Sequence, residues 1–374
     1  DLGLCPMAIL DGILVVALEQ AVAAPYCTRL LAESGARVIK LEREEGDFAR
    51  AYDSVVNGES AYFIWLNSGK ESLRIDIKNS SDRALLDKIL LKADVFIQNL
   101  KPGATDKLGL DYNTLANLNE RIIVCNISGY GHHGPYAKMK AYDALVQAET
   151  ALCSVTGPPG VPSKVGASIC DISTGLTAYS EILKALYNRE KKQSGSNIDV
   201  SLFGVLSEWM SVPLAYFEYS GKLLQGTGLD HAQLAPYGSF ETADGPVFIV
   251  IQNGREWIRF CESVLERPEI AADPRFCTNA NRIENLEELK KLINESFHAN
   301  PREALIAKLQ AAEIACGNIN NIADLSKHPA LVRCEVTSDG KTFRTVKHVG
   351  STISGLSVPK LGEHDELIRK EFSE

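Results

Sequence analysis

Short apolar runs alternate with longer helix-like segments over the first 130 residues of the chain. The apolar runs predict five β-strands, at residues 13–17, 37–41, 72–77, 94–98 and 122–126. Helices are predicted between them, at residues 25–35, 81–92 and 112–119. Strands separated by helices indicate β-α-β units and a largely parallel sheet. In such a sheet, ligands bind where loops gather at the carboxyl ends of the strands.

The middle of the chain is predicted to contain more loop. Residues 130–170 surround a single predicted helix at 141–155, and a strong helix follows at 174–189. A turn then leads into a sixth strand at 195–202.

The pattern changes again beyond about residue 225. Residues 238–251 predict a hairpin that turns at Asp244-Gly245, and charged helices run from 256 to 310. We therefore predict an α/β protein with three parts: a large domain at 7–224, a smaller α+β domain at 225–325, and a C-terminal segment at 326–374 that returns to the large domain.

Composition excludes several classes of protein. The chain of 374 residues has a formal net charge of −9, which argues against general binding of nucleic acids. No apolar run reaches the roughly 18 residues of a membrane helix, so no membrane association is predicted. The nine cysteines are scattered, odd in number and without a C-x-x-C pair. They argue against a disulfide scaffold and a zinc site, and they favour a reducing, cytoplasmic location.

Asp171 follows the small residues Gly166, Ala167 and Ser168 and directly precedes a predicted helix. Asp is a preferred N-cap residue, so a cap of that helix is the simpler interpretation. The small residues before it would also let a bulky ligand approach the backbone. Helix N–H groups are expected to lower the pKa of Asp171 and keep it ionised, and an accessible carboxylate can attack an acyl carbon. The two roles do not exclude each other.

Basic residues recur after successive predicted strands and before the helix that contains Tyr142. They are Lys40, Arg43, Lys78, Lys101, Lys107, Lys138 and Lys140. Each alone is most simply a solvated surface residue, but together they suit a ligand with several phosphates at one edge of the sheet. Neither a G-x-G-x-x-G dinucleotide fingerprint nor a Walker lysine loop is recognised, so an ordinary dinucleotide or nucleoside triphosphate site is not predicted. His132 and His133 lack a third ligand at suitable spacing, so no metal site is predicted.

Ordered motifs from about residue 8 to the C-terminal region resemble those of the family III CoA-transferases, also called the CaiB/BaiF family. In the first half they are Leu10-Asp-Gly-Ile-Leu-Val-Val16, Ala24-Pro-Tyr-Cys-Thr28, Gly35-Ala-Arg-Val-Ile-Lys-Leu-Glu42, Gly46-Asp47, Lys101-Pro-Gly103 and Lys107-Leu-Gly109. Further along they are Ile127-Ser-Gly-Tyr-Gly131, Tyr142-Asp143, Cys170-Asp171, Asp199-Val-Ser-Leu202, Pro236-Tyr-Gly238 and Gln252-Asn253.

The resemblance implies a Rossmann-like large domain that binds CoA, a smaller domain, and a homodimer of two interlocked, ring-like chains. Asp171 matches the family's catalytic aspartate. It would attack the thioester of a donor acyl-CoA, pass through an anhydride to an aspartyl-CoA thioester, and deliver CoA to an acceptor carboxylate. CoA and acyl-CoA are then substrates, and no permanently bound cofactor is expected.

The resemblance also implies which residues contact CoA. Ala21 and Val22 match backbone contacts of the first loop. Arg43, Ile75 and Lys78 match the nucleotide and phosphate site, Asn99, Leu100, Lys107 and Leu108 match the segment around adenine and ribose, and Lys140 and Tyr142 match residues near the pantetheine arm.

Two alternatives to the transferase stay open on the sequence. A racemase or isomerase on the same fold is disfavoured, because Tyr142 stands where the racemases of this family carry a histidine base, and a phenol with a pKa of about 10 is a poor proton shuttle. A non-catalytic acyl-CoA-binding protein would use Asp171 only as a cap. Among transferases, Gly226-Thr-Gly228 lacks the run of glycines of the formyl-CoA:oxalate branch, and residues 252–257 look more like members that handle C4–C5 dicarboxylates.

Overall fold

The computed structural model describes residues 8–351 and 353–373, so Met7, the first residue of the predicted large domain, lies outside it. The chain divides into two compact units. The first contains the N-terminal part through Leu152, Lys164–Ala215, and the chain from Val332 onward. The second contains Cys153–Ser163 and Tyr216–Leu331.

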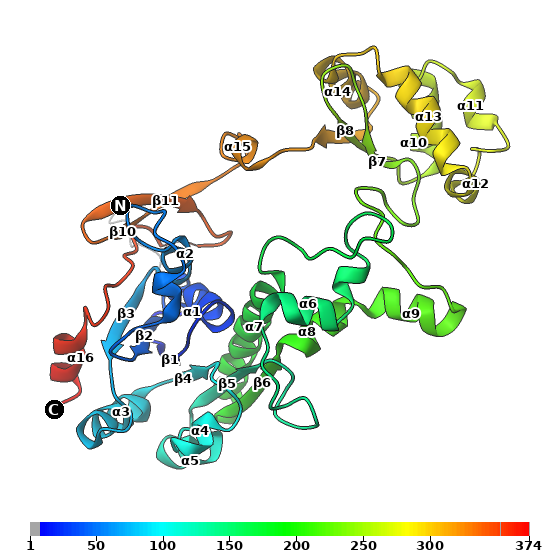
Figure 1. Ribbon diagram of the computed structural model, residues 1–374. Coiled ribbons are helices and arrows are strands. Elements are labelled where there is room, and N and C mark those ends of the chain that lie inside the picture. The colour runs from blue at the N-terminus through cyan, green and yellow to red at the C-terminus, as the bar shows by residue number, and fades with distance from the viewer. Residues whose placement is uncertain (1–7, 352, 374) are drawn as a thin grey trace. The chain divides into compact units, whose positions relative to one another are not determined.

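A six-stranded parallel sheet forms the centre of the first unit, with the strand order β3-β2-β1-β4-β5-β6 (Figure 1). Its strands are β1 (Leu14–Leu18), β2 (Arg37–Glu42), β3 (Lys70–Arg74), β4 (Val95–Gln98), β5 (Ile123–Ser128) and β6 (Ser196–Ser201). The predicted parallel sheet is confirmed. Its order is that of doubly wound nucleotide-binding folds. The chain adds β2 and β3 on one side of β1 and then β4, β5 and β6 on the other, so the switch point of the sheet lies between β1 and β4.

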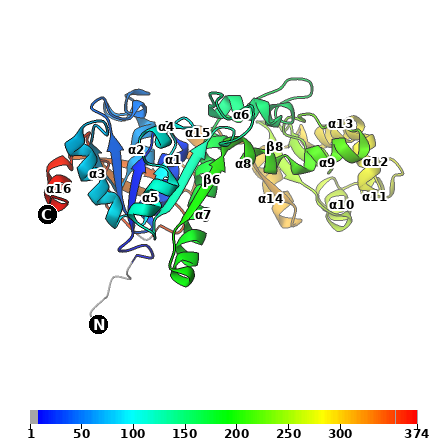
Figure 2. The same ribbon diagram turned by 90° about the horizontal axis from the view of Figure 1, so that it is seen from below.

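Helices cover both faces of this sheet because its buried strands alternate apolar side chains between the two faces. Val15 and Ala17 of β1 pack in one core with α1 (Ala23–Glu33) and α7 (Ile169–Lys192). Val16 packs in the opposite core, whose helices are α3 (Ser80–Lys92), α5 (Tyr112–Leu118) and α16 (Asp365–Glu371). The C-terminal helix α16 therefore lies beside α3, as both Figure 1 and Figure 2 show.

Other elements of the first unit were not predicted or differ in length. Helix α6 (Asp143–Glu149) ends six residues before the predicted 155, and α7 begins five residues before the predicted 174. The remaining elements are η1 (Phe48–Ala51), α2 (Ala61–Asn67), α4 (Ala104–Lys107), α8 (Leu202–Trp209), and the hairpin of β10 (Arg333–Ser338) and β11 (Lys341–Val346). Helix α9 (Ser211–Ser220) crosses the boundary between the units.

The second unit has an antiparallel sheet of three strands, in the order β7-β8-β9. Strands β7 (Tyr237–Phe240) and β8 (Val247–Val250) form the hairpin that the Asp244-Gly245 turn predicts, and β9 (Ala315–Asn318) pairs with β8. Helices that pack against this sheet include α10 (Gly254–Arg259), α13 (Leu286–Phe297) and α14 (Arg302–Ala311). The π-helical turn η3 (Phe260–Val264) and the short helices α11 (Glu269–Ala272), α12 (Asn279–Glu284) and α15 (Ile322–Leu325) complete the unit.

Gly175 lets α7 approach α1 closely. A Cβ atom at Gly175 would lie 2.5 Å from the carbonyl oxygen of Ala23 and 3.1 Å from the side chain of Tyr26. We expect Gly175→Ala to lower the free energy of unfolding by about 1–3 kcal/mol, because backbone must move to admit the methyl group. Urea denaturation measures this loss. Gly166→Ala is the matched control, since nothing lies within 4 Å of a Cβ there, and equal stability of the two variants would contradict the prediction.

Candidate active site

The loops after β1 and β4 meet at the switch point of the sheet and hold each other in place. The backbone N–H of Gln20 donates to Asn99 Oδ1 at 2.9 Å, and Asn99 Nδ2 donates to the carbonyl of Gln20 at 2.8 Å. The side-chain amide of Asn99, predicted to face adenine or ribose, is thus engaged by the first loop. Ala21 follows with a φ of 64°, a left-handed conformation that is uncommon outside glycine. Val22 is buried and occupies the N-cap position of α1.

A mainly apolar cavity of about 210 Å³ opens beside this switch point. Its lining brings together five of the residues predicted to contact CoA: Arg43, Ile75, Lys78, Leu100 and Leu108. Apolar walls with cations among their lining suit a flat heteroaromatic base that carries phosphates. This cavity is the candidate nucleotide site.

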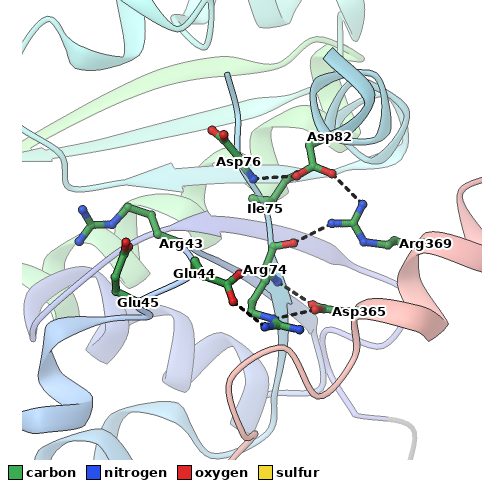
Figure 3. Close-up of a pocket in the computed structure, with 9 residues that line it drawn as sticks. All are labelled: Arg43, Glu44, Glu45, Arg74, Ile75, Asp76, Asp82, Asp365 and Arg369. Carbon is green, nitrogen blue, oxygen red and sulfur yellow. Dashed lines mark hydrogen bonds and ion pairs between the residues drawn. The ribbon is translucent and has the colours of Figure 1, made fainter. Parts of the chain in front are cut away.

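A second, more polar cleft of about 710 Å³ shares Arg43, Ile75 and Asp76 with the nucleotide site (Figure 3). Its arginines Arg74 and Arg369 are engaged by acidic partners: Arg74 Nε lies 2.9 Å from Asp365 Oδ2, and Arg369 Nη1 lies 2.7 Å from Asp82 Oδ1. Arg43 lies apart from these pairs in Figure 3. The backbone carbonyl of Arg43 accepts from the N–H of Gly46 at 3.0 Å. Within the described residues, the side chains of Arg43 and Lys78 have no hydrogen-bond or ion-pair partner, so both cations are available to a phosphate.

We expect Arg43→Ala and Lys78→Ala each to raise KM for acyl-CoA by roughly tenfold, with a smaller change in kcat, because each removes a charge-assisted contact to phosphate. Steady-state kinetics at low and high salt measure the effect, and the loss should shrink at high ionic strength. Arg344→Ala is the control, because Arg344 is exposed on β11, outside this cavity. A KM equal to that of the control would contradict the prediction.

The predicted row of basic residues is only partly present. Lys40 lies inside β2, fully buried, where its ammonium pairs with Asp47 and Glu19, so its assignment to that row was wrong. Lys101, Lys107, Lys138 and Lys140 are exposed, and none of them lines the nucleotide cavity. The charge pattern alone could not separate Lys40 from the others because its partners lie 7 and 21 residues away in the chain.

Asp171 does not cap its helix. Helix α7 begins at Ile169 with Ser168 in the N-cap position, so Asp171 is the third residue of the first turn. The capping carboxylate is Asp143, whose Oδ1 accepts from the backbone N–H groups of Cys170 at 2.8 Å and Asp171 at 3.0 Å. The N-cap interpretation of Asp171 is therefore wrong, because a residue from the start of α6 performs that role.

Asp143 is itself held by a buried glutamine. Gln147 Nε2 donates to Asp143 Oδ2 at 2.6 Å, and Gln147 Oε1 accepts from the N–H of Val165 at 2.8 Å. Gln147 has no exposed surface. One turn of α6 therefore fixes both the segment that leads to α7 and the first turn of α7, on which the Asp171 side chain stands.

The pKa of Asp171 is raised from its ordinary 3.8 to about 7, first by burial and then by the negative charge of Asp143. The predicted lowering of this pKa was wrong. The first-turn N–H groups that would stabilise an ionised Asp171 donate to Asp143 instead, and Asp143 adds repulsion. The half-buried carboxylate of Asp171 has no hydrogen-bond or ion-pair partner in the described part of the chain.

This raised pKa predicts a stability change. A carboxyl group whose pKa is higher in the folded state binds its proton more tightly there, so stability falls as pH rises from about 4 to 7 and stays reduced above 7. Asp171→Asn is thus expected to stabilise the protein at about pH 8, by at most about 4 kcal/mol given partial solvation, and to change little at about pH 4. Thermal denaturation at both pH values measures this, and a destabilised variant at the higher pH would contradict it.

Aromatic side chains lie close to Asp171. The pKa of Tyr52 is raised to about 12, by burial first and then by the charges of Asp47 and Asp171 and by the nearby phenols of Tyr142 and Tyr62. These groups therefore share one region, and the Tyr52 hydroxyl stays protonated at neutral pH. Tyr142 is 67% exposed, at the N-cap of α6.

Sequence reasoning missed Asp143, Asp47 and Tyr52 as functional candidates. Asp143 and Asp47 stand in two of the motifs quoted for the family resemblance, Tyr142-Asp143 and Gly46-Asp47, so a signal was available for both. Tyr52 carried no such signal, because η1 places it near Asp171 and η1 was not predicted.

The histidine pair lies in a loop that follows β5. His132 Nε2 is 3.4 Å from Asp199 Oδ1, and the described residues contain no group of three or more side chains arranged to hold a metal. A G-x-G-x-x-G spacing does occur here, at Gly129, Gly131 and Gly134. A loop rather than a helix follows it, so it lacks the helix N-terminus of a dinucleotide-binding turn.

The doubly wound sheet defines an α/β protein of the kind that binds nucleotides at the switch point of the sheet, and comparison with known proteins specifies its class. A family model for CoA-transferase family III matches residues 10–364. The chain is 34% identical to an acetyl-CoA:oxalate CoA-transferase of Acetobacter aceti, over 98% of this chain and 97% of that protein. It is 33% identical to a succinate–glutarate CoA-transferase of Agrobacterium fabrum, over 97% and 95%. A CaiB/BaiF family crystal structure from Brucella suis has a TM-score of 0.82 and 33% identity, over 97% and 99%.

The chain therefore belongs to CoA-transferase family III, as its motifs indicated. It is an enzyme that transfers CoA between an acyl-CoA thioester and a carboxylic acid, which sets aside the interpretation of a non-catalytic binding protein. Among the described residues, no helix combines the length and the apolar character that crossing a bilayer requires.

Proposed function

We propose that Asp171 is the nucleophile of this CoA-transferase and carries CoA as an aspartyl thioester between donor and acceptor. The observation that most directly supports this proposal is the environment of the Asp171 carboxylate. It is half-buried, has no side-chain partner in the described residues, and has a pKa of about 7. A carboxylate of raised pKa is more basic than an ordinary aspartate, and near neutral pH a large share of it is ionised. Both properties favour attack on an acyl carbon.

The reaction would proceed through exchanges of acyl groups that need no net proton. An Asp171 oxygen attacks the thioester carbon of the donor, the C–S bond breaks, and CoA leaves as a thiolate from a mixed anhydride. The thiolate attacks the aspartyl carbonyl of that anhydride and releases the donor acid. The acceptor carboxylate then attacks the aspartyl-CoA thioester, forming a second anhydride, and the returning thiolate takes the acceptor acyl group and frees Asp171. Each intermediate keeps the acyl bond activated.

The predicted CoA contacts that lie outside the nucleotide cavity remain part of this proposal. Ala21 and Val22 form the turn beside the switch point, and Lys140 and Tyr142 precede Asp143 on the exposed approach to α6. Lys107 and Asn99 flank Leu108 and Leu100, which do line the cavity. CoA is a substrate in this scheme, and no permanently bound cofactor is proposed.

We further propose that the acceptor is a small dicarboxylic acid. This rests on the names of the relatives, which specify oxalate in one case and succinate and glutarate in the other, at nearly equal identity. Residues 252–257 had favoured C4–C5 acids, so the length of the acid is the variable to measure. Rates with succinyl-CoA as donor and a panel of oxalate, glutarate, mesaconate and acetate would test it. A highest kcat/KM with the monocarboxylate acetate would contradict the dicarboxylate assignment.

The proposed assembly is the homodimer that the family resemblance implied. Helix α9 supports it because none of its residues is buried within the chain. Four of its large apolar or aromatic side chains are at least half exposed: Val212 (61%), Leu214 (52%), Phe217 (50%) and Tyr219 (89%). A large exposed apolar surface of this kind usually marks an interface. Light scattering should give twice the chain mass, and a monomer at micromolar concentration would contradict the proposal. A cytoplasmic location stays a prediction from the scattered cysteines.

A further inference from the structure

Four charged side chains form a fully buried ion cluster beneath the nucleotide site. They are Glu19, Lys40, Asp47 and Lys70, and none of their side chains has exposed surface. Lys40 Nζ lies 2.8 Å from Asp47 Oδ2 and 3.3 Å from Glu19 Oε1, while Lys70 Nζ lies 2.8 Å from Glu19 Oε1. Two cations and two anions balance, as buried charges require. Replacing such a cluster by apolar residues often stabilises a protein, so stability alone is a weak account of its presence.

Asp47 connects this cluster to the backbone of the site. Its Oδ2 faces Lys40, and its Oδ1 accepts from the N–H groups of Ala21 at 3.2 Å and Ala49 at 2.9 Å. The first bond holds the turn after β1, and the second caps η1. One carboxylate therefore fixes two segments: the loop that flanks the nucleotide cavity, and the short helix that leads to Tyr52 near Asp171.

The turn at Ala21 needs such a restraint. A φ of 64° in a residue with a Cβ costs free energy and persists only where its surroundings hold it. Asn99 engages both backbone groups of Gln20, and Asp47 engages the N–H of Ala21. The described hydrogen bonds to this turn thus come from two side chains, and of these Asp47 also binds the first turn of η1 at Ala49.

We propose that Asp47 is a positioning residue for acyl-CoA transfer, which sets the Ala21 turn and η1 through its Oδ1, and that Lys40 fixes the orientation of its carboxylate through Oδ2. Asp47 itself undergoes no chemistry in this account. The inference rests on the acyl-CoA site and the Asp171 nucleophile proposed above, so its test must report on Asp171 separately.

The test compares three single variants, Lys40→Met, Asp47→Asn and Asp47→Ala, with the two double variants K40M/D47N and K40M/D47A. Asp47→Asn alone should lower kcat/KM by about 100-fold, because one orientation of the amide sets its NH₂ group against the Lys40 ammonium and the other removes the oxygen from Ala21 and Ala49. When Lys40→Met also removes the ammonium, that conflict is gone, and the introduced amide can again offer an oxygen to both N–H groups. K40M/D47N should therefore recover to within about threefold of K40M, whereas K40M/D47A should stay at least about tenfold below it.

A control variant distinguishes a positioning role of Asp47 from a general loss of structure, and a separate measurement reports on the proposed nucleophile. Asp111 caps α5 by accepting from the N–H of Thr114 at 3.1 Å, outside the nucleotide cavity, so Asp111→Ala removes a comparable cap and should leave kcat/KM unchanged within about twofold. Trapping with hydroxylamine in the presence of acyl-CoA reports on Asp171. The wild type should be labelled at Asp171, and K40M/D47A should be labelled at the same residue about tenfold more slowly than K40M/D47N.

Several outcomes would overturn the inference. Equal kcat/KM and equal labelling rates for K40M/D47N and K40M/D47A would show that the oxygen at position 47 does not position the site. Loss of the folded circular dichroism spectrum in K40M/D47A but not in K40M/D47N would show that Asp47 acts on stability instead. Absence of label at Asp171 in the wild type would instead refute the nucleophile, while the kinetic comparison would still decide the role of Asp47.

Discussion

Asp171→Ala is expected to lower kcat for CoA transfer by at least about 10⁴-fold, while the affinity for CoA stays within about threefold of the wild type. The change removes the atom that forms the covalent intermediate. The neighbouring acid, Asp143, cannot replace it, because the Asp143 carboxylate accepts hydrogen bonds from Cys170, Asp171 and Gln147. The nucleotide cavity contains no atom of Asp171, so binding of the nucleotide end should survive. Calorimetric titration with CoA and an exchange assay measure the two quantities.

Asp111→Ala is the matched control for this prediction, because it removes a carboxylate from the same unit of the chain but outside the site. It should leave both kcat and CoA affinity unchanged. Retained turnover in Asp171→Ala would remove the covalent mechanism. Loss of CoA affinity together with turnover would show that Asp171 supports the fold of the site rather than the chemistry.

Replacing Asp143 is expected to change both the position and the ionisation of Asp171. In the wild type, kcat/KM should rise with pH through an acid limb near 7, because the ionised Asp171 attacks. Asp143→Asn can keep an oxygen for the N–H groups of Cys170 and Asp171, although its NH₂ group then faces Gln147 Nε2, which donates to Asp143 Oδ2 in the wild type. It also removes the repelling charge, so the limb should move to lower pH, with a smaller loss of rate than in Asp143→Ala. Asp143→Ala also removes the acceptor, and kcat should fall by about 100-fold because the first turn of α7 is no longer held.

Profiles of kcat/KM against pH for the three proteins test this account, with Glu149→Gln as a control that removes an exposed carboxylate from the same helix α6. Glu149→Gln should leave the pH midpoint of the acid limb of kcat/KM unchanged. A limb that stays near 7 in Asp143→Asn would show that burial alone raises the pKa of Asp171. Equal rates for the Asn and Ala variants would show that the hydrogen bonds of Asp143 do not position the nucleophile.

Strands β1, β4 and β5 could be predicted because each is a short apolar run, and such runs separated by helical segments are typical of a parallel sheet covered on both faces. Strands β3 and β6 carry more polar residues and were predicted from alternation and from the turn that precedes β6. The hairpin of β7 and β8 was equally predictable, since Asp244-Gly245 is a specific turn signal. Helix α2 and the hairpin of β10 and β11 were missed because short segments carry too little periodicity to be distinguished from loop.

The site was predictable only where local sequence decides the outcome. The position of Asp171 came from the family resemblance, but its environment depends on Asp143, 28 residues earlier, and on burial that no local pattern reports. Asp171 was interpreted as the N-cap because it is the acidic residue nearest to the predicted start of the helix. Lys40 shows the same limit: its burial follows from partners on β1 and on the loop after β2, which only the folded sheet brings together.

The central claim is that the Asp171 carboxylate becomes covalently linked to acyl or CoA groups during turnover. Incubation with an acyl-CoA, trapping with hydroxylamine and peptide mass spectrometry test that claim most directly. We expect a hydroxamate at Asp171 that forms only when acyl-CoA is present. An unmodified Asp171 in enzyme that is turning over, or a modification confined to another residue, would contradict it.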